Sequence, residues 1–199
     1  MSSNIIVFER QVLSLAIIEK ELFQLYTEIA QKAEDVSAKT LLSYIATDSL
    51  KHSTILAAIF DEVNGSKAKE SDCDVNIRYN KQLIETLTKD ISKTETISQE
   101  ELISLIDTLC NFEELLYNEY KKSFHLEYTQ VTTGYKSQKD EEPELNIFNL
   151  IVGDEERHQK ILMSLVILCD RKLSFKQDAP VVKYQSPDSW YVPPRGRRQ

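Results

Sequence analysis

Four stretches of the chain carry apolar residues at alternating steps of three and four, which predicts four long amphipathic helices. They span about residues 4–34, 37–63, 98–128 and 144–171. Each apolar stripe is interrupted near its middle by polar residues: Glu19; Asp48, Ser49 and His52; Glu113; and Glu155 with His158. A carboxylate that is buried alone costs several kcal/mol, so these groups are expected to pair with one another or to bind a metal.

The interruptions follow an internal repeat. Two octets, Ile45–His52 and Ile151–His158, both place an aspartate four residues before a histidine. In the second octet Glu155 lies three residues before His158, so both side chains share one helix face. In the first octet Ser49 stands where its twin has Glu155. The first and third helices match as well, because Glu19 and Tyr26 have the same spacing as Glu113 and Tyr120. The sequence therefore predicts two similar helix pairs that face each other.

The connections between the predicted helices suggest their topology. A short turn at residues 35–37 makes the first two helices antiparallel neighbours, whereas residues 64–97 form a long crossover that includes a possible short helix at about 77–93. The residues Ser98 to Glu101 form a capping box, and Pro143 is a typical residue for a helix start. One long crossover between the second and third helices predicts an all-α, antiparallel four-helix bundle of ferritin-like topology over residues 1–172.

Composition and charge exclude several classes of function. Residues 1–170 hold 17 basic and 30 acidic side chains, and such an acidic body argues against nucleic-acid binding. No apolar run is long enough for a membrane span, and the charged N-terminal region does not resemble a signal peptide. Three widely spaced cysteines form neither a disulfide framework nor a metal knuckle. We therefore expect a cytoplasmic protein.

On these residues the chain resembles the rubrerythrin and ferritin-like di-iron carboxylate family, over about residues 8–170. The resemblance implies two iron ions in the bundle, with manganese or zinc as other ions that suit nitrogen and oxygen ligands. The implied metal ligands are Glu19, His52, Glu113, Glu155 and His158. The segment Asp154 to His158 fits a D-E-x-R-H pattern, in which the aspartate orients a ligand histidine. Asp48 and Asp154 are therefore expected behind the histidines.

The resemblance also implies partners and an activity. The expected chemistry is oxidation of Fe(II) or reduction of O₂ or peroxide. The chain has no pair of C-x-x-C motifs that would indicate a rubredoxin module, so the electron donor would be a separate partner. Proteins of this kind commonly form homodimers. Tyr26 and Tyr120 are read mainly as core aromatics, with a role beside the metals as the alternative. His125 has no partner at a useful spacing.

Ser49 departs from the family pattern, which expects a bridging or chelating glutamate at this position. Three alternatives stay open: a dinuclear site with an open coordination position, one tight and one weak metal, or Asp48 as a substitute ligand. A metal-binding protein without turnover is accordingly one alternative function. Another is a scaffold or cargo protein that acts through residues 173–199, a basic tail rich in proline and aromatic residues. Within this tail, residues 180–199 are a possible docking peptide for a protein partner.

Overall fold

The computed structural model describes residues 3–64, 75–123 and 143–178. These residues form five α-helices, which are α1 (Ser3–Lys32), α2 (Val36–Asn64), α3 (Val75–Ser92), α4 (Gln99–Ser123) and α6 (Pro143–Asp178). The prediction of an all-α protein is confirmed, and so is the short helix in the long connection, which is α3. His125 and the expected docking peptide at 180–199 lie outside the described residues.

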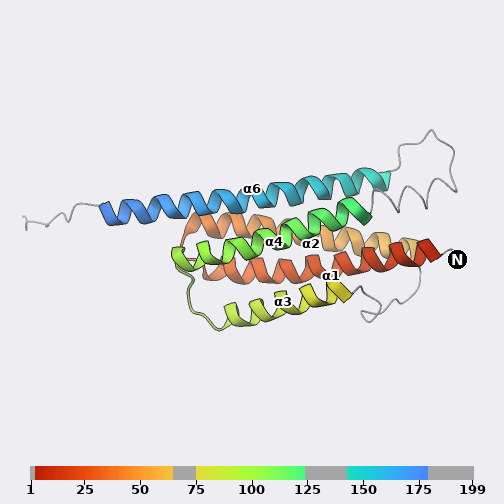
Figure 1. Cartoon of the computed structure of the whole chain (residues 1–199), viewed down its shortest axis with the longest axis horizontal. Coiled ribbons are helices and arrows are strands. Elements are labelled where there is room, and N and C mark those ends of the chain that lie inside the picture. The colour runs from red at the N-terminus through yellow and green to blue at the C-terminus, as the bar shows by residue number, and fades with distance from the viewer. Residues whose placement is uncertain (1–2, 65–74, 124–142, 179–199) are drawn as a thin grey trace, which may run out of the picture.

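The helices pack mainly as two pairs, α1 with α2 and α4 with α6, and α3 packs along α1. Figure 1 shows that α2 and α4 run in one direction while α1 and α6 run in the other. The chain therefore returns along the length of the molecule through α3 before α4 begins. None of the described helices is long and apolar enough to cross a membrane.

Local hydrogen bonds explain where the helices begin. The predicted capping box is formed: the Ser98 hydroxyl accepts from the Glu101 backbone N–H at 3.2 Å, and the Glu101 carboxylate accepts from the Ser98 N–H at 2.8 Å. At the start of α2, Asp35 Oδ1 accepts from the Ala38 N–H at 3.0 Å. The helix α6 continues to Asp178, beyond the end at about residue 171 that its stripe predicts. After the stripe ends, the next residue that strongly opposes a helix is Pro180.

The core consists of apolar side chains from all five helices, with a polar layer in the middle of α1, α2, α4 and α6. Large buried residues on both sides of this layer include Leu15 and Ile29 on α1, and Phe148 and Leu165 on α6. Seven polar residues of the predicted stripes are buried within it: Glu19, Asp48, Ser49, His52, Glu113, Glu155 and His158. The apolar flanks exclude water from this layer, so its charged groups depend on one another or on a bound ion.

Candidate metal centre

The five sequence-predicted ligands all lie in the buried layer, and none is more than 2% exposed. They come from four helices, with Glu19 on α1, His52 on α2, Glu113 on α4, and Glu155 and His158 on α6. They form two buried groups, each of which could hold a metal ion. The layer resembles a di-metal site in its residue types and in its division into two similar halves.

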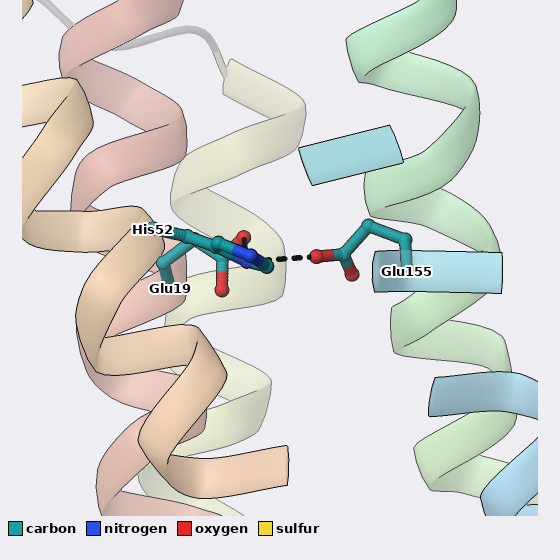
Figure 2. A group of neighbouring side chains, drawn as sticks. All are labelled: Glu19, His52 and Glu155. Atoms are coloured by element: carbon teal, nitrogen blue, oxygen red, sulfur yellow. Dashed lines mark hydrogen bonds and ion pairs between the residues drawn. The ribbon is translucent and has the colours of Figure 1, made fainter. Parts of the chain in front are cut away.

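The first group contains Glu19, His52 and Glu155, whose potential ligand atoms all lie within 4.8 Å of one another. His52 Nδ1 is 3.2 Å from Glu19 Oε1 and 3.0 Å from Glu155 Oε1. Figure 2 shows Glu155 reaching from the opposite side of the layer toward the His52 ring, while Glu19 approaches from the helix beside it. One histidine nitrogen and two carboxylates therefore converge from three helices.

The second group contains Glu113, His158 and the same Glu155. His158 Nδ1 lies 3.0 Å from Glu113 Oε2 and 3.9 Å from Glu155 Oε2. The two histidine rings are stacked, with centroids 6.0 Å apart. Glu155 thus belongs to both groups, and a different one of its oxygens faces each histidine.

The outer nitrogen of each histidine contacts an aspartate from the other octet. His52 Nε2 lies 3.1 Å from Asp154 Oδ2, and His158 Nε2 lies 3.3 Å from Asp48 Oδ2. Each aspartate also pairs with a cation on its own helix: Lys51 is 2.5 Å from Asp48, and the Arg157 guanidinium is 2.7 Å from Asp154. The Nδ1 atoms therefore face the layer, while the aspartates fix the ring orientations from outside.

The two tyrosines also bond across the helix pairs. The Tyr120 hydroxyl on α4 donates to Glu19 Oε1 on α1 at 2.7 Å. The Tyr26 hydroxyl on α1 donates to Glu113 Oε1 on α4 in a short hydrogen bond. Both rings are fully buried, and burial raises the pKa of both hydroxyls well above their usual value. They therefore act as neutral donors that hold the two glutamates in place.

Burial and the neighbouring charges shift the pKa values of the ionisable groups in the layer. Burial raises the pKa of Glu155 well above its usual range, and the charges of Glu19 and Glu113 raise it further. Burial alone would lower the pKa of His52 and His158, but their contacts with Glu19 and Glu113 outweigh it and raise both values. For Glu113 the contact with His158 outweighs burial and lowers the pKa. Glu155 and the two histidines would bind a metal ion in their deprotonated forms.

Several buried carboxylate oxygens of the layer have no hydrogen-bond partner in the described part of the chain, and this bears on whether the layer could hold metal ions. Glu155 Oε1 lies within ion-pair distance of His52 Nδ1, but the hydrogen bond of that nitrogen goes to Glu19. Apart from a proton that it could share with Glu113, neither oxygen of Glu155 has a hydrogen-bond partner among the described residues. Glu19 Oε2 also has no hydrogen-bond partner among the described residues. An unsatisfied buried carboxylate oxygen is unfavourable in a folded protein unless something else binds it. Both oxygens of Glu155 and one of Glu19 are therefore available to metal ions.

Three residues beside the layer have no assigned role in the sequence-based prediction. The internal repeat marks two of them but not the third. Lys51 and Arg157 occupy the same position in the two octets, immediately before the histidines, and each contacts the aspartate of its octet. Tyr44 is different, because its twin position holds Leu150 and nothing in the repeat marks it. Its hydroxyl accepts from Arg157 at 2.9 Å, and its ring meets the His158 ring edge-on.

Comparison with protein-family models, with curated proteins and with solved structures finds no match.

Proposed function

We propose that this chain is a ferritin-like protein that binds two non-haem metal ions in the buried layer, two irons or iron with manganese, and that it oxidises Fe(II) or reduces peroxide or O₂. The observation that carries the proposal is the position of Glu155, whose carboxylate lies between two histidine–glutamate pairs from opposite helix pairs. The helix directions and the long return through α3 support a ferritin-like bundle with one crossover as the fold of this proposal.

The residues divide evenly between two ions. Glu19 and His52 would hold one ion, Glu113 and His158 would hold the other, and Glu155 would contribute to both. Three carboxylates supply three negative charges against the four positive charges of two divalent ions. The chemistry supplied by bound iron is electron exchange with O₂ or peroxide. The protein keeps this chemistry away from bulk water and holds the ligands rigidly through Tyr26 and Tyr120.

A second candidate function is metal binding without turnover, and Ser49 favours it. Ser49 is buried at the position that corresponds to Glu155 in the other octet, so the layer has one carboxylate fewer than its repeat would give. A missing ligand can weaken one metal position enough to prevent two-electron chemistry. Metal stoichiometry distinguishes this candidate from the first.

The first experiment measures metal content and then reactivity. The full chain is purified, analysed for metals, loaded with Fe(II) without oxygen and exposed to O₂ or to peroxide. The proposed function predicts about two irons per chain and a near-ultraviolet absorption change as they are oxidised, repeated on further Fe(II) additions. One metal per chain and no absorption change would support the second candidate. No bound metal after loading would refute both.

The matched pair of variants is Glu155→Gln and Glu156→Gln. Glu155 is buried between the two groups, whereas its neighbour Glu156 is exposed and pairs with Lys160. Because Glu155 belongs to both groups, Glu155→Gln should weaken the binding of both ions by more than about 10- to 100-fold, which is the loss when only a residue behind a ligand is changed. Glu156→Gln should leave binding unchanged. Equal effects of the two substitutions would contradict the proposed site.

A further inference from the structure

Within the buried layer, the internal repeat is broken at one pair of positions, 49 and 155. The other paired positions carry matching residues: Glu19 with Glu113, Tyr26 with Tyr120, Asp48 with Asp154, and His52 with His158. Ser49 is 1% exposed and lies three residues before His52, as Glu155 lies three residues before His158. The serine therefore stands inside the layer, on the helix face that carries the ligand histidine.

No neighbouring carboxylate of the described chain is free to replace the missing one. Asp48 Oδ1 pairs with Lys51 and its Oδ2 with His158 Nε2, on the outer side of that ring. Asp154 is held in the same way by Arg157 and His52. Asp48 could therefore turn inward as a ligand only by giving up its contacts with both Lys51 and His158. Among the described residues, the ligand set of the layer is three carboxylates and two histidines.

Such a set leaves room for a non-protein ligand. Each group supplies three protein residues, and a metal position with only three protein ligands is normally completed by water or by a substrate. The charges of two divalent ions also exceed those of the three glutamates by one. An external ligand with a single negative charge would complete both the coordination and the charge of the layer.

We propose that the layer binds a small external monoanion of about the size of formate or azide beside Ser49, where it takes the place of the missing glutamate. The Ser49 hydroxyl donates a hydrogen bond to this anion, and the metal pair of the proposed function, on which this inference rests, holds its other end. Hydroperoxide belongs to the same chemical class, so this position also defines the side from which peroxide reaches the metals.

The test uses the full chain loaded with Co(II), whose visible spectrum reports its ligands. Titration of the loaded protein with azide, and separately with formate, should change the spectrum with saturation. Ser49→Glu supplies the carboxylate from the chain and should weaken azide binding by tenfold or more, with two Co(II) ions still bound. Ser49→Ala removes the hydrogen-bond donor and should weaken azide by about tenfold.

Ser53→Ala is the matched control, because Ser53 is a buried serine one turn along α2 whose hydroxyl donates to the Ala16 carbonyl at 2.8 Å. Azide binding should be unchanged in this variant. Two bound Co(II) ions with the same azide affinity in the wild type, Ser49→Glu and Ser49→Ala would overturn this inference and leave the metal centre standing. Absence of Co(II) and Fe(II) binding would overturn both.

Discussion

Asp35 accepts hydrogen bonds from three helices at the end of the molecule where α1 is followed by α2. Its Oδ1 accepts from the Ala38 N–H at the start of α2, and its Oδ2 accepts from Lys172 on α6 and, at 3.4 Å, from Gln99 on α4. The hydrogen bond from Lys172 is the main cause that lowers the pKa of Asp35. Because the folded pKa is below the unfolded one, the carboxylate stabilises the fold above the unfolded pKa, and this contribution is lost as the pH falls through the folded value.

Substitution of Asp35 should therefore have a pH-dependent and a pH-independent effect. Asp35→Asn keeps a capping oxygen but loses the charge, and should cost up to about 1 kcal/mol near pH 7, since Lys172 is partly exposed. Urea unfolding should show this difference shrinking toward zero as the pH falls below the folded pKa of Asp35.

Asp35→Ala is the companion variant because it also removes the helix cap. It should cost about 1–2 kcal/mol more than Asp35→Asn, by an amount that does not change with pH. A loss in Asp35→Asn that stays constant down to the acid limit would show that Lys172 contributes nothing through charge.

At the scale of elements, α3 is joined to the rest of the molecule at its C-terminal end by Lys32 of α1. The ammonium donates to the carbonyls of Ile91, Ser92 and Thr94 at 2.9, 2.6 and 2.7 Å. These carbonyls lie at and just beyond the end of α3, where a cation is favourable to the helix dipole. The apolar side chains Ile84 and Ile91 are buried in the core, so α3 depends on both this cap and apolar packing.

Lys32→Met keeps the apolar stem and removes all three donors. We expect a loss of about 1.5–3 kcal/mol in unfolding free energy and faster amide hydrogen exchange, concentrated at the end of α3. Lys20→Met, at an exposed position of the same helix, is the control and should change neither quantity. Unchanged exchange in α3 after Lys32→Met would mean that packing alone holds this helix.

At the scale of the whole molecule, periodicity and internal repeat predict most of the helices and the composition of the layer. The spacing of Glu155 and His158 places them on one face, and the same reasoning applies to Glu19 and Glu113. Spacing identifies the face of a helix but not the neighbour it meets. The pairing of Asp48 with His158, rather than with the histidine of its own octet, depends on how two helices cross. The apolar stripe of α6 does not predict where this helix ends, because a helix can continue after its stripe stops.

Without bound metal, the buried polar layer should lower the free energy of unfolding of the protein. Glu155 is buried next to His52, and apart from a proton that it could share with Glu113 its oxygens have no hydrogen-bond partner among the residues described. A buried carboxyl group without a hydrogen-bond partner carries a desolvation penalty, which an apolar side chain of similar size does not carry. Glu155→Met should therefore raise the unfolding free energy of the metal-free chain by about 1–3 kcal/mol.

Metal should reverse this order. At a free metal concentration of one hundred times the dissociation constant, binding stabilises the wild type by about 2.7 kcal/mol for each ion, or about 5 kcal/mol for two, and this gain should be largely absent in Glu155→Met. Thermal unfolding with chelator and with Mn(II) measures both quantities, and Glu156→Met at the exposed neighbour is the control. If Glu155→Met were less stable than the wild type in chelator, Glu155 would contribute to the fold without metal, and the layer would be a structural ion-pair network. A wild type that is less stable than Glu155→Met in chelator but more stable than it with Mn(II) is the result expected of a metal-binding site.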